Sequence, residues 1–384
     1  MNTMAMNNQC AQYCIDVIRA LMQEEPISAI PDTVSLAELY DFSKMHGVEA
    51  MVHHGLVQLE MDEADPIWQN WQNRADMLLT QSIVQLAERD MLFAALPAAG
   101  IKLLPVKGCW LKEQYPAIDY RQMSDLDILI PEADVQKAKQ CMLEQGYTPE
   151  AEVAENHDCY FKHPYMEVEL HRSLLRKDES QYHYYDDVWE NAVQEEACPG
   201  VYRLKTEDEY IYYLLHLHKH ILGAGTGLRT ILDCVVYRDA YPDMERDYLH
   251  HELERLGLWG FAQEIETLSD CWFRTGTPVP ETLANLVDII IAAGSYGTYE
   301  ILSRQRMDRI QEKYKNPLVR AVAYWVIQIC RPREEMEHNY PVLKKLPVLL
   351  PVCWIIRAVR KFAAQPKGVM YHIRVVFGGA KKHD

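Results

Sequence analysis

Hydrophobic positions in the first hundred residues recur with the period of an α-helix. Residues 8–24, 34–61 and 66–96 each place apolar side chains three and four positions apart, which predicts three amphipathic helices. Ser35 and Glu38 stand three residues apart at the start of the second segment, and this spacing predicts a capping box. The N-terminal quarter of the chain is therefore expected to be helical.

Beyond residue 100 the period shortens to two. Alternation of apolar and polar residues is typical of half-buried β-strands, whereas the segments between them keep a helical spacing. The predicted elements are a strand at 101–106, a helix at 108–115, a strand at 125–130, a helix at 132–146, and a hairpin of 158–163 and 166–172 turning at Pro164.

Strand patterns disappear after Thr206, and helical patterns continue to about residue 331. Thr206 and Glu209 have the spacing of a second capping box. The predicted fold class is α+β, with a small mixed-sheet core flanked by N-terminal helices and a C-terminal helical domain. The expected domains are an N-terminal helical region (1–98), the core (99–200), a helical domain (201–335) and a C-terminal tail (336–384).

The charge of the chain is unevenly distributed. The formal net charge is −17, yet residues 341–384 hold nine basic residues and one acidic residue. The acidic body makes a long nucleic acid an unfavourable partner. The basic, partly apolar segment 341–374 suits peripheral contact with an anionic membrane, or packing of its apolar side on the helical domain. Its longest apolar run, 346–356, is too short to span a bilayer.

Cysteine usage and the N-terminal sequence favour a cytoplasmic protein. The ten cysteines are scattered singly without a C-x-x-C pair, which is typical of reduced thiols. The first ten residues lack the basic and apolar regions of a signal peptide.

Two carboxylates stand out in the stretch MSDLDILI. Asp125 and Asp127 project from the same face of a predicted strand, about 6 to 7 Å apart, and would repel each other without a cation between them. Glu167 and Glu169 form a similar acidic face in MEVELHR. Oxygen ligands of this kind suit Mg²⁺, and paired metal ions serve phosphoryl transfer. The alternative is a pair of edge strands whose charged faces prevent aggregation.

The segment VKGCWLKEQYPAIDYRQMSDLDILIPEADVQKAKQCMLEQGY, with the later VELHR and LHLHKHILGAGTGLRTILDCVVY, resembles the bacterial nucleotidyltransferase-like family. This family lies within the DNA polymerase β superfamily, and the resemblance spans roughly residues 80–300. Its pattern is Lys-Gly, a short helix with Tyr-Pro, an Arg, Asp-x-Asp in a strand, a helix ending in Gly-Tyr, and an acid-Leu-His strand.

The resemblance implies transfer of a nucleoside monophosphate from an NTP such as ATP to an acceptor hydroxyl, with Mg²⁺ or Mn²⁺ as cofactor. Asp125, Asp127 and Glu169 match the metal-binding and catalytic carboxylates, and Glu169 would also orient or deprotonate the hydroxyl. The acceptor is expected to be a small molecule, a sugar or a protein. The matching nucleotide-binding positions are Lys107, Gly108, Cys109 and Arg121.

Two departures from the family pattern concern the nucleotide. Cys109 stands where a second glycine or a serine is usual, and the gap from this turn to Asp125 is longer than is typical. Arg121 could also pair with Asp119 instead of a phosphate. A non-catalytic member that binds a nucleotide or a partner is therefore the alternative function.

Histidines raise a further possibility. His216 and His220 lie at i and i+4, a spacing that zinc enzymes use, although packing beside the active cleft is the simpler interpretation. Arg229 and Asp233 have the spacing of a salt bridge on a helix surface. His171 could orient Glu169 or be an ordinary polar strand residue.

Overall fold

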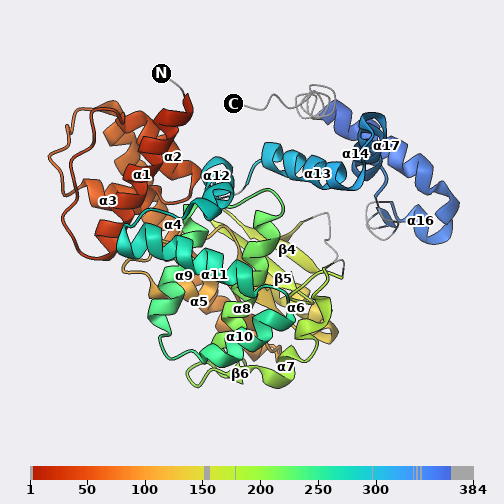
Figure 1. Cartoon of the computed structure of the whole chain (residues 1–384). Coiled ribbons are helices and arrows are strands. Elements are labelled where there is room, and N and C mark those ends of the chain that lie inside the picture. The colour runs from red at the N-terminus through yellow and green to blue at the C-terminus, as the bar shows by residue number, and fades with distance from the viewer. Residues whose placement is uncertain are drawn as a thin grey trace.

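The computed structural model of the chain describes residues 3–150, 156–177, 179–295, 297–331, 333, 336–337 and 340–364. Its N-terminal part is helical, as predicted (Figure 1). The capping box between Ser35 and Glu38 is present. The helices are α1 (Thr3–Met22), α2 (Leu36–Met45), α3 (Glu49–Leu56) and α4 (Pro66–Ala98).

The single helix predicted at 34–61 is wrong, because the chain breaks between α2 and α3. Gly47 adopts a φ of 64° there, a left-handed conformation that ends a helix and that glycine reaches without strain. A Cβ at Gly47 would lie 2.8 Å from Oγ of Ser295. The break thus lets a distant segment of the chain approach the backbone.

Five short strands form one mixed sheet in the order β1-β2-β5-β4-β3, which confirms the predicted α+β class. The central strands β2 and β5 are parallel, and each other neighbouring pair is antiparallel. The predicted hairpin forms from β4 and β5, whereas the strand predicted at 101–106 is reduced to two residues. The elements are β1 (Leu104–Pro105), α5 (Gly108–Leu111), η1 (Lys112–Gln114), β2 (Leu126–Leu129), η2 (Glu132–Asp134), α6 (Val135–Glu144), β3 (Thr148–Pro149), β4 (His157–Lys162) and β5 (Met166–His171).

Helices follow the sheet, interrupted by one small two-stranded ladder of β6 and β7. The capping box predicted for Thr206 and Glu209 is wrong: the helix begins at Thr206, and its N-cap residue Lys205 makes no side-chain cap bond. The elements are η3 (Tyr182–Tyr185), α7 (Val188–Asn191), β6 (Val193–Gln194), β7 (Tyr202–Arg203), α8 (Thr206–Ile221), α9 (Leu228–Ala240), α10 (Arg246–Arg255), α11 (Trp259–Asp270), η4 (Cys271–Thr275), η5 (Glu281–Leu283) and α12 (Ala284–Ala293).

Two hydrophobic cores join these elements. The larger core combines the N-terminal helices with α8 to α12, and the smaller core fills the space between the sheet, α4 and α6. Helix α4 belongs to both cores, since Trp71 packs in the first and Leu96 in the second. The helices on either side of the sheet therefore hold it in a fixed position.

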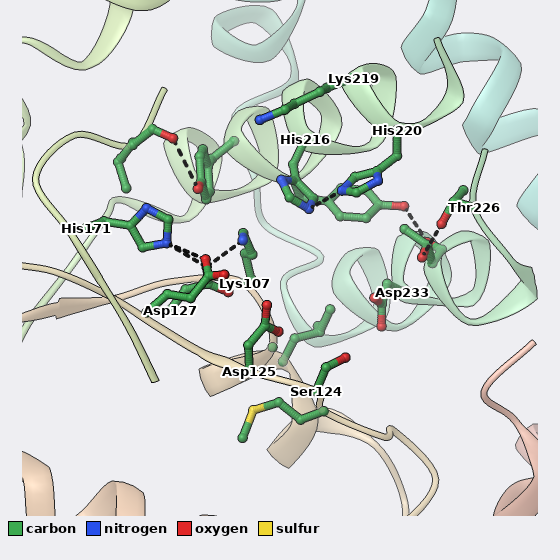
Figure 2. Close-up of a pocket in the computed structure, with 18 of the residues that line it drawn as sticks. Lys107, Ser124, Asp125, Asp127, His171, His216, Lys219, His220, Thr226 and Asp233 are labelled. Carbon is green, nitrogen blue, oxygen red and sulfur yellow. Dashed lines mark hydrogen bonds and ion pairs between the residues drawn. The ribbon is translucent and has the colours of Figure 1, made fainter. Parts of the chain in front are cut away.

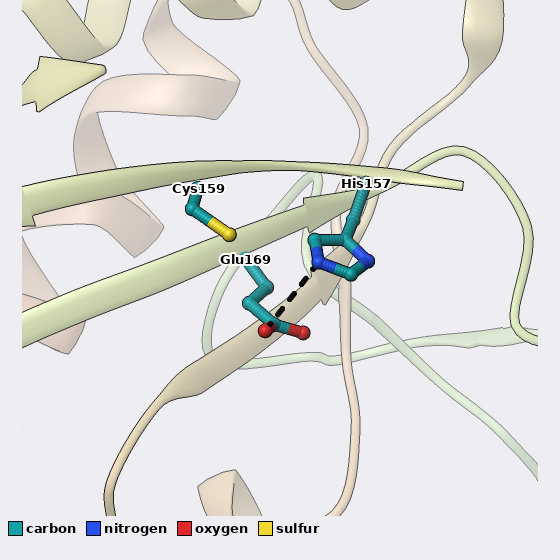
Figure 3. Close-up of side chains that lie close together, drawn as sticks. All are labelled: His157, Cys159 and Glu169. Atoms are coloured by element: carbon teal, nitrogen blue, oxygen red, sulfur yellow. Dashed lines mark ion pairs between the residues drawn. The ribbon is translucent and has the colours of Figure 1, made fainter. Parts of the chain in front are cut away.

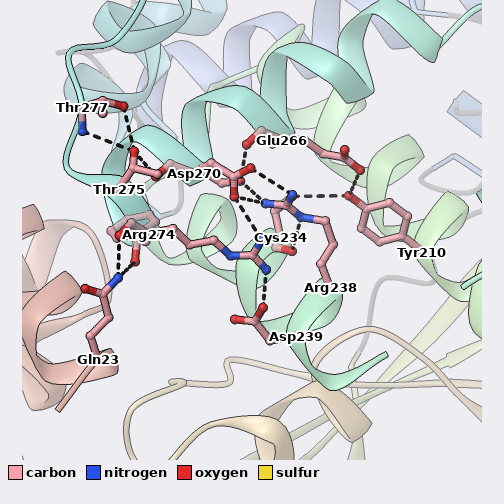
Figure 4. Close-up of polar contacts among 12 residues, drawn as sticks. Gln23, Tyr210, Cys234, Arg238, Asp239, Glu266, Asp270, Arg274, Thr275 and Thr277 are labelled. Atoms are coloured by element: carbon pink, nitrogen blue, oxygen red, sulfur yellow. Dashed lines mark hydrogen bonds and ion pairs between the residues drawn. The ribbon is translucent and has the colours of Figure 1, made fainter. Parts of the chain in front are cut away.

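Polar contacts reinforce the junction between the end of α1 and η4 and the junction between α9 and α11 (Figure 4). Gln23 donates through Nε2 to the carbonyl of Arg274 at 2.6 Å. Arg238 on α9 donates from Nη2 to Oδ1 of Asp270 at 2.5 Å, at the end of α11. Buried and half-buried charges of this kind are satisfied by their partners, so the helical scaffold behind the sheet is well determined.

The C-terminal helices extend away from this body (Figure 1) and form small apolar clusters of their own. The first of them contacts the body, since Gln305 donates from Nε2 to the carbonyl of Ile221 at 2.6 Å. Val352, Ile355 and Val359 recur on one face of the last helix and are exposed. The membrane contact predicted for this segment stays a prediction. Residues 365–374 of that segment lie outside the described residues. None of the described helices combines the length and apolar character needed to cross a membrane. The elements are α13 (Tyr299–Lys313), α14 (Pro317–Ile329), α16 (Val342–Lys345), η6 (Pro347–Leu349) and α17 (Leu350–Ala364).

Candidate active site

The register of the two parallel strands places acidic residues side by side. Asp127 on β2 and Glu169 on β5 are direct Cα partners. Their neighbours in each strand, such as Ile128 and Leu170, are buried in the smaller core, so the acids point to the opposite face of the sheet. Asp125 immediately precedes β2 and lies two residues from Asp127.

All three acids line one cavity of about 760 Å³ between the sheet and helices α8 and α9. Figure 2 shows Asp125 and Asp127 on the sheet side, with His216 and His220 across the cavity from them. Its lining also includes Lys107, Gly108, Arg121, His157, Cys159, His171, Glu209, Tyr212, Lys219, Arg229 and Asp233. The structure thus brings together residues that are more than 100 positions apart in the sequence.

Asp127 is the most strongly bound of the acids. Its Oδ1 accepts a hydrogen bond from Nζ of Lys107 at 2.6 Å and another from Nε2 of His171 at 2.8 Å. Burial alone would raise the pKa of Asp127, but the positive charge of Lys107 and the hydrogen bond from His171 hold it well below its usual range. Asp127 is therefore a buried carboxylate whose charged form is favoured by its two partners.

The pKa of Asp125 is shifted in the opposite direction from that of Asp127. Burial, followed by the negative charge of Asp127, raises the pKa of Asp125 to about 6, although Lys107 partly offsets the rise. A second carboxylate of raised pKa beside a charged one marks a place where additional positive charge is favourable.

His171 links two of the acids. Its Nε2 lies 2.8 Å from Oδ1 of Asp127 and 3.1 Å from Oε2 of Glu169. Burial would lower the pKa of His171, but its hydrogen bonds to Asp127 and Glu169 raise it. His171 is therefore not an ordinary polar strand residue, because it fixes the orientation of both carboxylates.

The predicted nucleotide-binding residues occupy different environments. Lys107 has a φ of 57°, a conformation that costs energy for a residue with a side chain, and it turns the chain into α5. Gly108 begins α5 and lines the cavity, whereas the Cys109 side chain is buried in the smaller core. Only the backbone of Cys109 could therefore face a ligand, and its N–H donates to the carbonyl of Val106.

Arg121 also lines the cavity, but its guanidinium is engaged. It donates from Nε and Nη2 to the two carboxylate oxygens of Asp233, at 2.8 and 2.9 Å. The pairing of Arg121 with Asp119 considered from the sequence is wrong: Asp119 lies beside His54, with Oδ2 3.3 Å from Nε2. Arg229 donates from Nη1 to the carbonyl of Gln122 at 2.5 Å.

Helix α8 supplies the wall opposite the acids. His216 and His220 approach each other with their Nε2 atoms 2.9 Å apart, beside the cleft as the simpler interpretation predicted. Burial, reinforced by the charge of Lys107, lowers the pKa of His220 to about 4 and that of His216 well below its usual range. Within the described residues, two groups of side chains lie close enough together to hold one metal ion: Asp127, Glu169 and His171, and His157, Cys159 and Glu169. Neither group includes His216 or His220.

Sequence reasoning gave little weight to two contributors to the site, His157 and His171. His171 lies on the strand whose acidic face was recognised and follows Glu169 by two residues, so the period of two was an available signal. His157 begins β4, one residue before the strand predicted at 158–163. Nothing in the local sequence indicates that Lys107 would pair with Asp127. That contact depends on the packing of β1 against β2.

The fold and the site define the chain as an α+β protein whose mixed sheet presents a group of carboxylates to a cavity that is partly open to solvent. The chain belongs to the family described as uncharacterised nucleotidyltransferases, which it matches over residues 32–274. No curated protein and no solved structure matches the chain.

Proposed function

We propose that the chain is a Mg²⁺-dependent nucleotidyltransferase that moves a nucleoside monophosphate from an NTP to an acceptor hydroxyl and releases pyrophosphate. The observation that carries this proposal is the alignment of Asp127 with Glu169 across parallel strands, with Asp125 beside them on the same cavity. Membership of a nucleotidyltransferase family supports it.

The residues of the site fit a hard divalent cation such as Mg²⁺ or Mn²⁺. Asp125, Asp127 and Glu169 offer carboxylate oxygens, which such cations prefer. The raised pKa of Asp125 and the cationic contact of Lys107 with Asp127 both indicate that this location favours positive charge. Bound metal would neutralise charge on the phosphates and align the displacement.

In the proposed reaction the acceptor oxygen attacks the α-phosphorus, the bond from this phosphorus to the bridging oxygen of the β-phosphate breaks, and pyrophosphate leaves. Glu169 would accept the proton of the acceptor hydroxyl. His171, hydrogen-bonded to Asp127 and Glu169, holds both carboxylates in place. The negative charge of the triphosphate would be met by Lys107 and by cations across the cavity.

Gly108 begins α5 and lines the cavity, so its backbone would lie near the triphosphate, whereas the N–H of Cys109 already donates to the carbonyl of Val106. Arg121 is held by its ion pair with Asp233, so its positive charge would act on the phosphates at a distance. Lys219 and Arg229 line the opposite wall and complete the positive surroundings. These residues support an anionic nucleotide as one substrate.

The size of the cavity favours a compact acceptor. A volume of about 760 Å³ lies in the range of roughly 300–1,000 Å³ that small-molecule pockets occupy. The acidic charge of the chain disfavours a long nucleic acid. A small molecule, a sugar or a protein hydroxyl is therefore the expected acceptor.

Pyrophosphate release tests the proposal. Each NTP is incubated with Mg²⁺, cell metabolites and either the wild type, Asp127→Asn or Asp243→Asn, the last an exposed loop position that serves as the matched control. We expect Asp127→Asn to lose at least about a hundredfold in rate, or about 3 kcal/mol of transition-state stabilisation, and Asp243→Asn to retain the wild-type rate.

Thermal unfolding separates the catalytic proposal from the non-catalytic alternative. A nucleotide that binds the folded chain raises its melting temperature. A Mg²⁺-dependent rise without any pyrophosphate release would favour a nucleotide-binding protein. If neither a rise nor release is seen with any NTP, both functions are wrong.

A further inference from the structure

Three side chains of types that can bind a metal ion lie close together at one edge of the cavity lining (Figure 3). His157 and Cys159 belong to β4, and Glu169 belongs to β5. Cys159 and Glu169 are direct Cα partners in the antiparallel pair, and His157 stands two residues from Cys159. Because side chains two apart share one face of a strand, all three project to the same side of the sheet.

The three side chains converge on one point of the cavity lining. One ligand atom from each lies within 4.8 Å of the others, and Nε2 of His157 is 3.5 Å from Oε1 of Glu169. All three are half-buried, with 21% of the His157 side chain and 19% of the Glu169 side chain exposed. A cation could therefore enter from the cavity and leave much of its hydration behind.

The chemistry of these donors differs from that of the neighbouring carboxylates. A thiolate, an imidazole and a carboxylate are ligands for Zn²⁺, whereas Mg²⁺ takes oxygen ligands. Three protein ligands with a fourth position open to solvent form a typical accessible zinc site. We propose that His157, Cys159 and Glu169 bind Zn²⁺, with release of the thiol proton of Cys159 on binding.

Glu169 belongs to this group and is also one of the three carboxylates of the proposed Mg²⁺ site, with Asp125 and Asp127. Its Oε1 faces His157, and its Oε2 lies 3.1 Å from Nε2 of His171, which in turn contacts Asp127. Zn²⁺ on β4 would draw the Glu169 carboxylate toward His157 and Cys159. If Glu169 is the third Mg²⁺ ligand, as the proposed function holds, Zn²⁺ then inhibits transfer by competing for this one carboxylate.

Cobalt(II) is the probe for binding, since a Co²⁺–thiolate bond gives a charge-transfer absorption in the near ultraviolet. We expect the full chain to show this band, Zn²⁺ to abolish it, and Cys159→Ser to lack it. Cys198→Ser, which removes a half-buried cysteine elsewhere, should keep the band. His157→Gln should weaken Co²⁺ affinity by more than the roughly 10–100-fold that loss of an outer-shell partner costs.

The same experiment distinguishes this site from the proposed nucleotidyltransferase centre. Asp125→Asn removes a carboxylate of that centre only and should retain the cobalt–thiolate band, whether or not the chain is an enzyme. A band that is missing in the wild type, or that persists in Cys159→Ser, overturns the zinc site. Circular dichroism and thermal unfolding of each variant confirm that the fold is intact.

Inhibition is measured as the ratio of pyrophosphate release with and without equimolar Zn²⁺, at fixed excess Mg²⁺. This ratio should fall several-fold in the wild type and stay near one in Cys159→Ser. An equal fall in both proteins would show that Zn²⁺ acts elsewhere and would contradict the competition for Glu169.

Discussion

Arg121 and Asp233, which lie 112 residues apart in the sequence, form an ion pair with two hydrogen bonds in the lining of the cavity. Only 10% of the Arg121 side chain and 4% of the Asp233 side chain are exposed. Tyr115 also donates its hydroxyl to Oδ1 of Asp233 at 2.7 Å. The pair joins the segment before β2 to helix α9, so it fixes the sheet relative to the helices that face it.

Removing one member of this pair should destabilise the protein strongly. Asp233→Asn or Arg121→Met leaves the other charge buried without its partner, which typically costs about 3–5 kcal/mol. Urea unfolding measures the loss. The double variant Arg121→Met with Asp233→Leu should be less destabilised than either single variant, because it leaves no isolated charge. Additive losses would contradict this account.

Gly108 is required by the position of Arg121. A Cβ on residue 108 would lie 2.1 Å from Nη1 and 3.0 Å from Cζ of Arg121, which Asp233 holds in place. Gly108→Ala should therefore cost about 1–3 kcal/mol of stability, as overpacking does, and weaken nucleotide binding. Gly260→Ala is the matched control, since its Cβ would meet nothing within 4 Å. Equal stability of the two variants would disprove the contact.

The stability of the fold should decrease as the pH rises, because Glu209 becomes ionised. Burial outweighs the charge of Arg203 and raises the pKa of Glu209 from 4.5 to about 7. Between these values the folded state holds a proton that the unfolded state has lost, so raising the pH destabilises the fold, by as much as roughly 3 kcal/mol.

Glu209→Gln should remove this dependence. Its free energy of unfolding is expected to equal that of the wild type near pH 4 and to exceed it at pH 8, because glutamine resembles the protonated acid. Urea unfolding at several pH values measures the difference. A difference that stays constant across this range would show that folding leaves the pKa of Glu209 unchanged.

The C-terminal helix should bind anionic lipid. Val352, Ile355 and Val359 form an exposed apolar stripe on α17, a helix that also carries the basic residues Arg357 and Arg360. Basic residues near an anionic surface contribute about 1 kcal/mol each. The chain should therefore sediment with phosphatidylserine vesicles and not with phosphatidylcholine vesicles.

Ile355→Asp should reduce this sedimentation several-fold. Ile83→Asp, at an exposed apolar position on α4, is the control and should leave it unchanged. Failure of the wild type to sediment with anionic vesicles would show that the stripe has another partner or none.

Local sequence patterns determined the class of fold and the identity of the acidic residues. The alternation around Asp127 and Glu169 places acids on one face of each strand and apolar residues on the other, whatever the strand neighbours are. The capping box at Ser35 was predictable for the same reason, since its bonds join residues only three apart.

Tertiary structure alone decided how those residues are paired. The register that sets Asp127 against Glu169, the contact of Lys107 with Asp127, and the partner of Arg121 each join segments distant in the sequence. Burial, which also depends on tertiary packing, determined the environment of Glu209: this residue was expected to cap a helix but lies inside the protein near Arg203. Periodicity fixes which face a side chain occupies, but its partner and the cost of its charge depend on what packs against that face.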